Sequence, residues 1–438
     1  MNNLKNIFLL FFLSFKLLCD PLEINVTDGK IEPTPIAITK INYSSSKEKE
    51  ISYKMHEVIK NNLNNSGLFK TISNKAFLQK EDEVFLQPLF SDWRIIDANL
   101  IISGEIIINS GILTTRIKLW DVYREKLILS KKISGINITK WRFLSHLISN
   151  LVYERVTGEK GYFDTKIVYI AEEASTGTKK KRIAMMDYDG NNHQFLTDGS
   201  NLVLTPRFSP NKENIVYLSY SKNRPAVYIL NINSGKSKKL GNFKGMSFAP
   251  RFSPSGDKII FSLTKKGSSN IYILSFANNK TLQLTNNKHI NTSPSFSPDA
   301  KKVVFSSDRA GKQNLYIISL NAVKKTPKRI TFGKGNYATP VWSPRGDYIA
   351  FTKSFGKRFY IGLIKSNGMD ERIISEGYLV EGPTWSPNGR TLAFYKINKR
   401  NNIKNSKIYT IDITGNLEKE LPTPFQASDP DWGSTNKY

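Results

Sequence analysis

One short motif repeats along the C-terminal two-thirds of the chain and constrains its fold more than any other feature. The motif reads proline, any residue, an aromatic residue, serine and proline. Five full copies begin at Pro206, Pro250, Pro294, Pro340 and Pro383, and an imperfect sixth copy begins at Pro430. The copies follow one another at spacings of 43 to 47 residues. A repeat of this length is typical of β-propeller blades and other repeat architectures.

Each copy is followed by the pattern of a four-stranded blade, as the second copy illustrates. Its turn at Ser253–Gly256 contains proline, which presets the φ of the second turn position, and glycine, which accepts a positive φ. Apolar strands are then predicted at Ile259–Leu263 and Ile271–Phe276, and a short fourth strand at Gln283–Thr285. Four strands within one repeat of this length make a propeller blade.

The ends of the repeat region predict how the ring closes. The runs Ile167–Ala171, Ile183–Tyr188 and Gln194–Thr197 supply the second, third and fourth strands of a blade, and no motif precedes them. The sixth motif at Pro430–Trp432 is the missing first strand. Pairing these ends leaves no sheet edge exposed. We therefore expect residues 162–438 to form a six-bladed β-propeller closed by the C-terminal strand.

Residues 20–161 show no repeat and mix helix and strand patterns. Apolar residues at helical spacing predict helices over Ile51–Leu63 and Trp141–Val156. Strands are predicted at Ile36–Ile41, Asn99–Ile108, Leu113–Val122 and Leu127–Ile133, the middle two as a hairpin. The predicted fold class is thus an all-β six-bladed propeller preceded by a small α+β domain.

The first 19 residues resemble a cleavable secretory signal. The apolar run Ile7–Phe15 follows Lys5 and is too short to span a membrane. An N-terminal buried strand or helix is the alternative. A lipoprotein anchor at Cys19 is disfavoured because the preceding Leu18 is bulky. Cys19 is the only cysteine, so cleavage after it leaves no thiol and no disulfide. These features predict an exported protein of the periplasm.

The formal net charge of +27 raises the question of a nucleic-acid partner. Nucleic-acid binding proteins cluster lysine and arginine on one face with stacking aromatics between them. Here the basic residues are scattered through turns, and Lys179–Arg182 is the only compact cluster. We therefore interpret the charge as a solvated basic surface and expect no nucleic-acid partner, with attraction to anionic envelope surfaces as a secondary effect.

No catalytic or metal-binding constellation is evident in the sequence. The histidines His56, His146, His193 and His289 show no metal-ligand spacing to one another, to the cysteine or to carboxylates. Asp187 and Asp189 flank a turn glycine, where carboxylates commonly stabilise the backbone. The nucleophile elbow of hydrolases, the Walker A loop and the dinucleotide fingerprint are missing. We predict a protein without enzymatic activity, cofactor or metal.

Six loops that lead into the motif strands are expected to meet around one mouth of the propeller channel. They contain aromatic, methionine and histidine side chains, which are Met246, Phe248, His289, Tyr337, Tyr378 and Phe425. Aromatic and methionine side chains are enriched in protein interfaces. We predict a protein-binding surface at this mouth, although some of these side chains are expected to pack beneath neighbouring loops.

Beyond the blades, several segments of the chain resemble the TolB family. They are Glu23–Gly29, Pro35–Ile38, Asp97–Gly104, Thr157–Gly161 and Asp187–Gly190, and the resemblance covers nearly the whole chain. It implies a periplasmic, non-enzymatic adaptor of the Tol-Pal system, which maintains outer-membrane integrity and supports outer-membrane constriction during cell division. It implies no membrane span. A monomer is expected.

The resemblance also implies partners and sites. The propeller mouth is expected to bind the lipoprotein Pal, with Ala249 and Thr292 carried over by motif and Met246 standing where the family often has histidine. His289, Tyr337 and Tyr378 complete this set. The arm Asp20–Pro33 is expected to engage TolA, through Asp20, Leu22, Ile24, Val26 and Asp28. Other outer-membrane or peptidoglycan-associated proteins stay open as partners, and an exported propeller hydrolase or lyase acting in the channel is the alternative function.

Overall fold

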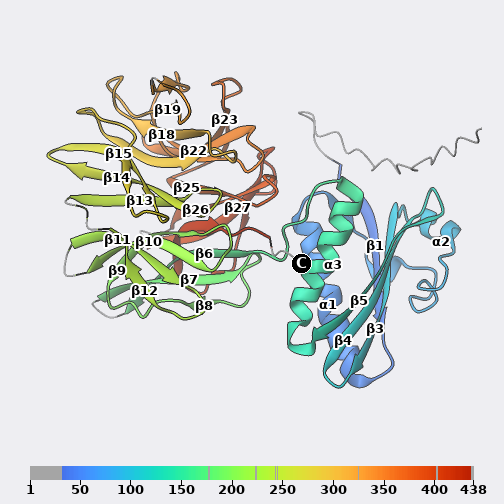
Figure 1. Cartoon of the computed structure of the whole chain (residues 1–438). Helices are drawn as coiled ribbons and strands as arrows, with labels where there is room; N and C mark the ends of the chain where they lie inside the picture. The colour runs from blue at the N-terminus through green and yellow to red at the C-terminus, as the bar shows by residue number, and fades with distance from the viewer. Residues whose placement is uncertain are drawn as a thin grey trace, which may run out of the picture.

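The computed structural model describes residues 32–175, 178–221, 224–241, 243, 245–323, 325–400 and 403–435. Figure 1 shows a ring of strands beside a smaller part that mixes helices and strands. Helices α1 (Ser46–Asn65) and α3 (Trp141–Thr157) lie between the small sheet and the ring. The predicted signal segment at residues 1–19 lies outside the described residues. No helix among the described residues is long and apolar enough to cross a membrane.

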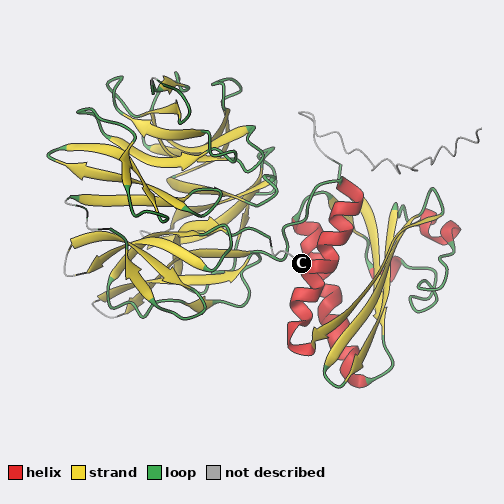
Figure 2. Ribbon diagram, in the orientation of Figure 1, coloured by secondary structure: helices red, strands yellow, loops and turns green. Residues whose placement is uncertain are grey.

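The N-terminal part is one five-stranded sheet in the order β2-β1-β3-β4-β5, covered on one face by α1 and α3 (Figure 2). Its strands are β1 (Thr34–Asn42), β2 (Phe69–Thr71), β3 (Leu100–Asn109), β4 (Ile112–Asp121) and β5 (Lys126–Asn137), joined by α2 (Phe90–Ile95), η1 (Asn74–Ala76) and η2 (Ile138–Lys140). Strand β1 is parallel to β2 and β3, whereas β3, β4 and β5 are antiparallel. All the strands and helices predicted for this part are present, and the short β2 and α2 are additions.

Successive side chains of β1 point to opposite faces of the sheet, and both faces are buried. Ile36 and Ile38 belong to the core under α1 and α3, while Ala37 belongs to a second core under α2. Helix α1 begins with a capping box in which Glu48 Oε2 accepts from Ser45 N at 2.9 Å. The other carboxylate oxygen of Glu48 accepts from Ile108 N at 2.8 Å. One side chain therefore both starts the helix and joins it to β3.

The ring consists of six four-stranded antiparallel sheets, as the motif predicts. The first three blades after the N-terminal part are β9 (Leu202–Phe208), β10 (Asn214–Ser221), β11 (Arg224–Asn231) and β12 (Ser237–Lys239); β13 (Met246–Phe252), β14 (Lys258–Lys265), β15 (Ser268–Ser275) and β16 (Thr281–Gln283); and β17 (Asn291–Phe296), β18 (Lys302–Ser307), β19 (Asn314–Ser319) and β20 (Lys328–Arg329). The next two are β21 (Asn336–Trp342), β22 (Tyr348–Phe355), β23 (Arg358–Lys365) and β24 (Arg372–Gly377); and β25 (Leu379–Trp385), β26 (Thr391–Arg400), β27 (Ile403–Asp412) and β28 (Lys419–Glu420).

The sixth blade joins the two ends of the propeller, which confirms the predicted closure. It contains β29 (Gln426–Trp432), β6 (Lys166–Ser175), β7 (Thr178–Asp187) and β8 (Gln194–Phe195), in that order. Strand β29 is antiparallel to β6, with Ala427 opposite Ala171 and Trp432 opposite Ile167. The motif strands β9, β13, β17, β21, β25 and β29 contact one another in sequence, and β29 contacts β9. The motif strands therefore form the inner wall of a closed ring.

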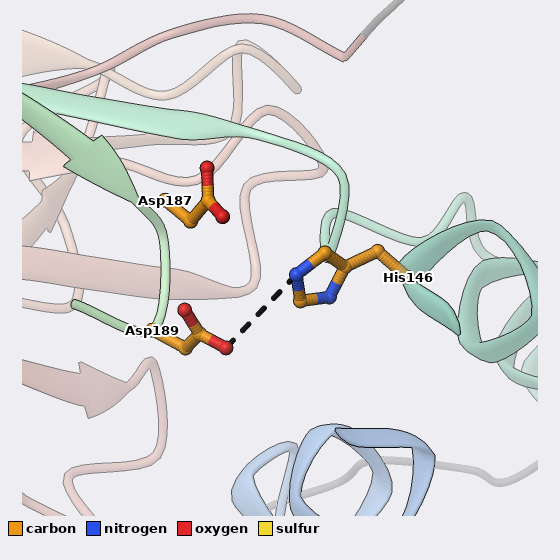
Figure 3. Close-up of side chains that lie close together, drawn as sticks. All are labelled: His146, Asp187 and Asp189. Atoms are coloured by element: carbon orange, nitrogen blue, oxygen red, sulfur yellow. Dashed lines mark ion pairs between the residues drawn. The ribbon is translucent and has the colours of Figure 1, made fainter. Parts of the chain in front are cut away.

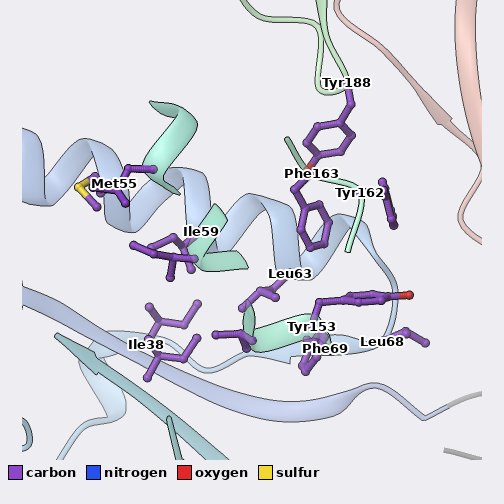
Figure 4. Close-up of a cluster of buried hydrophobic side chains, with 14 of the residues drawn as sticks. Ile38, Met55, Ile59, Leu63, Leu68, Phe69, Tyr153, Tyr162, Phe163 and Tyr188 are labelled. Atoms are coloured by element: carbon purple, nitrogen blue, oxygen red, sulfur yellow. The ribbon is translucent and has the colours of Figure 1, made fainter. Parts of the chain in front are cut away.

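The hydrophobic core of the N-terminal part continues into the closing blade (Figure 4). Tyr162 packs edge-on against Tyr188 and Trp432, with ring centroids 5.7 Å apart in both pairs. Trp432 Nε1 donates to Thr165 Oγ1 at 2.7 Å. The strand that closes the ring is therefore also the strand on which the first domain packs.

Candidate functional site

The two faces of the propeller are set by the direction of the motif strands. Each inner strand begins at one face, which we call the rim face, and ends in its Ser-Pro turn at the other, the turn face. The N-terminal part packs on the turn face, where Asn388 Nδ2 donates to Lys160 O at 3.0 Å and Arg345 forms an ion pair with Glu159 at 2.9 Å. The rim face is on the side of the ring away from these contacts.

Every inner strand bends at the same level. The residue before the motif proline has a positive φ of 45° to 67° in all six blades, at Thr205, Ala249, Ser293, Thr339, Gly382 and Asp429. At this point the pairing with the second strand shifts register. A bulge of this kind bends a strand, and positive φ is costly for any residue but glycine. The six bulges separate the rim loops from the regular channel wall.

Five of the six side chains predicted to bind Pal are accessible at the rim face. Met246 at the start of β13 is 44% exposed, and Tyr378 between β24 and β25 is 51% exposed. His289 is exposed, with Nδ1 3.7 Å from Asp308 Oδ1. Ala249 and Thr292 are half-buried on β13 and β17. These five lie in three of the six blades, those of β13, β17 and β25, on one face of the ring.

Tyr337 differs from the other five residues predicted to bind Pal, because its side chain is fully buried. Its ring lies against Phe351, with centroids 5.3 Å apart, and Lys353 Nζ sits 4.8 Å from the ring centroid. Its hydroxyl donates to Glu371 Oε1 at 2.7 Å. Apolar packing and a satisfied hydroxyl hold Tyr337 beneath the rim, so it supports the surface and does not face a partner.

Sequence reasoning missed other accessible side chains of the rim face. Leu202, Phe332 and Phe355 are 44%, 71% and 50% exposed at the start of β9, after β20 and at the tip of the β22–β23 hairpin. Exposed lysines lie among them, which are Lys266, Lys288, Lys334 and Lys357. Large apolar residues beside loop glycines, as in Phe332-Gly333 and Phe355-Gly356, are the signal that could have found them. The rim face therefore carries exposed apolar side chains with lysines among them.

The channel end at the turn face has a different chemistry. A cavity of about 350 Å³ is lined there by the motif residues of all six blades. Asp431 Oδ1 lies 3.8 Å from Arg207 Nε and 3.7 Å from Arg251 Nη1. Burial raises the pKa of Asp431, and the two arginines oppose this. The sequence motif contains these residues at its variable second position, but only the ring brings them together.

A second polar cluster joins the two domains. It contains His146, for which the sequence showed no partner at metal-ligand spacing. His146 on α3 lies beside Asp187 at the end of β7 and Asp189 in the turn that follows, with one ligand atom of each within 4.8 Å of the others (Figure 3). Arg142 occupies the same carboxylates, pairing with Asp189 and lying 3.5 Å from Asp187, and Lys166 reaches Asp187 at 2.7 Å. Because two cations already neutralise the carboxylates, we interpret the cluster as an ion-pair network and not as a metal site.

A buried asparagine completes this junction. Asn62 on α1 accepts from Tyr188 Oη at 2.6 Å and donates to His146 Nδ1 at 3.0 Å and Ser149 Oγ at 2.9 Å. Burial lowers the pKa of His146 to about 4, although Asp189 opposes this. His146 is therefore neutral near pH 7, with Nδ1 accepting from Asn62. A cleft of about 780 Å³ opens beside this network between α1, α3 and the turn face.

Comparisons with known proteins match both parts of the chain to one family. Residues 22–128 match the TolB amino-terminal domain, and residues 153–436 match the TolB beta propeller domain. The solved structure of TolB from Acinetobacter baumannii superposes with a TM-score of 0.83 at 24% identity, covering 92% of this chain and 97% of that one. This likeness supports the fold.

Sequence relatives extend the match over the full length. The Tol-Pal system protein TolB of Paramagnetospirillum magneticum is 49% identical over 415 residues, which is 94% of this chain and 92% of the relative. The protein of the same name from Rickettsia prowazekii is 45% identical in an alignment that covers 98% of this chain and 99% of the relative. The chain therefore belongs to the TolB family of Tol-Pal system proteins.

Proposed function

We propose that the protein is a periplasmic adaptor of the Tol-Pal system that binds the lipoprotein Pal through the rim face and TolA through its N-terminal arm. In this role it maintains outer-membrane integrity and supports outer-membrane constriction during cell division. It is exported by the signal at residues 1–19 and acts as a monomer without cofactor, enzymatic activity or nucleic-acid partner.

The observation that carries this proposal is the accessibility of the rim face. The N-terminal domain packs on the opposite face, so the rim loops with Met246, His289 and Tyr378 are open to a partner. Exposed apolar side chains grouped on one face favour protein binding. Ala249 and Thr292 lie at and beside the bulges of the inner strands β13 and β17, further from the rim loops than Met246 and His289.

The channel favours binding over catalysis. Among the described residues, the second motif positions carry a single carboxylate, Asp431, and two guanidinium groups share it. General acid-base hydrolysis of a saccharide uses two carboxyl groups facing one bond. The turn-face end of the channel offers no such pair and does not support the hydrolase or lyase alternative.

The Pal site is tested with a blocking substitution and a matched control. Thr292→Tyr adds a large side chain at the inner rim, and Ser255→Tyr adds the same bulk to an exposed turn at the opposite face. We expect purified Pal to bind the wild-type protein and Ser255→Tyr equally and to bind Thr292→Tyr at least tenfold more weakly by calorimetry. Equal affinity for all three proteins would contradict a Pal site at the rim.

The TolA site lies outside the described residues, because Asp20, Leu22, Ile24, Val26 and Asp28 precede residue 32. Removing residues 20–33 from the exported protein should abolish binding to TolA and leave Pal binding intact. Retained TolA binding would move this site to the described part of the chain.

A further inference from the structure

The inner wall of the propeller carries a hydrogen bond between neighbouring blades that is present in three blades and absent in the other three. The second motif residue of one blade accepts a hydrogen bond from the backbone N–H of the aromatic residue in the next blade. Ser295 Oγ accepts from Trp342 N at 3.2 Å, and Thr384 Oγ1 accepts from Trp432 N at 3.2 Å. Asp431 Oδ2 accepts from Phe208 N at 2.8 Å across the closure. An acceptor side chain in this position therefore satisfies an inward-facing N–H.

In the other three blades this position holds Val341, Arg207 or Arg251. Val341 is apolar, and the two arginines carry donors only. Arg207 and Arg251 therefore cannot accept from the next aromatic residues, Phe252 and Phe296. These two N–H groups point toward the channel, because the N–H of each following serine bonds outward to the second strand at 2.9 Å and alternate N–H groups of a strand point to opposite edges. Two backbone donors and two guanidinium groups thus converge on one side of the channel.

The acceptors near these donors satisfy Arg207 but not Arg251. Arg207 Nη1 donates to Pro206 O at 2.7 Å and also approaches the carbonyls of Asp429 and Pro430. Within the described residues the Arg251 guanidinium makes no hydrogen bond, and its only ionic partner is Asp431 Oδ1 at 3.7 Å. Two cations face one carboxylate, which leaves one positive charge uncompensated. The Arg251 side chain is 17% exposed, so its donors are open to water or to a ligand in the channel.

Burial also changes the pKa of the Arg251 guanidinium. It lowers the pKa of Arg251 to about 9, with Arg207 adding to the fall and Asp431 opposing it. The surrounding cavity of about 350 Å³ is roughly ten times the liquid volume of one water molecule, about 30 Å³. It has room for a small ligand and several waters.

We propose that the turn-face end of the channel binds a small oxyanion through Arg251, Arg207 and the N–H groups of Phe252 and Phe296. The ligand is a carboxylate or phosphate group, because a guanidinium fork matches two oxygens of such a group. Asp431 limits the net positive charge of the site to one, so a singly charged oxyanion neutralises it. This site is independent of the proposed adaptor function, which uses the opposite face.

The test compares anions at equal ionic strength and pH 7 on the exported protein. Sodium phosphate and sodium acetate are titrated against sodium chloride while Tm is measured. We expect phosphate or acetate to raise Tm by a few degrees in a saturable manner, since a ligand that binds only the folded state stabilises it by mass action. The anion that acts at the lower concentration distinguishes a phosphate site from a carboxylate site. No saturable rise above chloride overturns the proposal.

Two variants locate the effect. Arg251→Ser removes the guanidinium and gives Phe296 N–H an acceptor of the kind that Ser295 provides to Trp342, so this variant is expected to fold. It should need at least tenfold more anion for the same Tm shift. Arg358→Ser is the control, because Arg358 lies on the rim and pairs with the exposed Glu376. An unchanged anion response in Arg251→Ser overturns the site, and the wild-type titration decides the matter if that variant does not fold.

Discussion

The two faces of the propeller arise from the same six strands but use their side chains differently. At the rim face, Met246, Phe332 and Tyr378 expose apolar surface between lysines. At the turn face, Trp432 is buried against Tyr162 of the first domain, and Asp431 is enclosed by arginines. Several side chains before the bulge are exposed, whereas residues after it pack within the ring and against the first domain. The rim face therefore keeps large apolar side chains accessible, whereas the turn face buries them between the ring and the first domain.

The largest effect is expected from Trp432→Ala at the turn face. Loss of a buried tryptophan at a closing strand and a domain interface should lower the free energy of unfolding by about 3–5 kcal/mol. Urea unfolding followed by tryptophan fluorescence and circular dichroism measures it.

Trp385→Ala is the matched control for this change. Trp385 holds the same motif position in the preceding blade, and its Nε1 donates to Val341 O at 3.0 Å within the ring. Both variants should be less stable, but only Trp432→Ala should separate the unfolding of the two domains into two transitions. A single transition in both would contradict a special role of the closing strand in domain packing.

A smaller loss is expected when the asparagine between the domains is removed. Asn62→Ala leaves Tyr188 Oη and His146 Nδ1 without their partner, which should cost about 2–4 kcal/mol. Asn61→Ala, an exposed neighbour on the same helix, should change the stability little. Equal denaturation midpoints for the two variants would show that the buried network does not hold the domains together.

The pH dependence of stability tests the same junction. Folding lowers the pKa of His146 from 6.5 to about 4 through burial, with Arg142 also lowering it and Asp189, Asp187 and Asp164 opposing. The unfolded chain then binds a proton that the folded chain does not. Stability should therefore fall as pH drops from about 6.5 toward 4, by about 1–3 kcal/mol. His146→Gln should flatten this slope between pH 5 and pH 7, and an unaltered slope would assign the pH dependence to other groups.

The smallest stability change is expected at the rim. Met246→Ala and Phe355→Ala remove exposed side chains and should alter the free energy of unfolding by no more than about 0.5 kcal/mol. The same urea experiment measures both. A loss above about 2 kcal/mol at either position would mean that the rim also serves cohesion, and would remove the contrast between the two faces.

Much of the fold follows from local sequence signals. The six Pro-x-aromatic repeats predict the blades, and the unpaired motif at Pro430 predicts the closure with residues 167–171 that the register of β29 and β6 confirms. The helix over Ile51–Leu63 follows from its apolar spacing. The site is less predictable. Tyr337 is an aromatic residue in a rim loop like Tyr378, and no local pattern tells that one ring is buried on Phe351 while the other is exposed.

The sequence by itself determined the number of blades, their order and the family, because strand alternation, turn residues and repeat length are properties of short segments. Only the tertiary structure decided which chemistry converges. Arg207 precedes Asp431 by 224 residues in the sequence, yet both Arg207 and Arg251 approach the same carboxylate oxygen of Asp431. His146 likewise approaches Asp189 across the boundary between the two domains. Such contacts depend on how the ring closes and how the first domain docks on it, since burial and charge pairing act between groups that only the completed fold brings together.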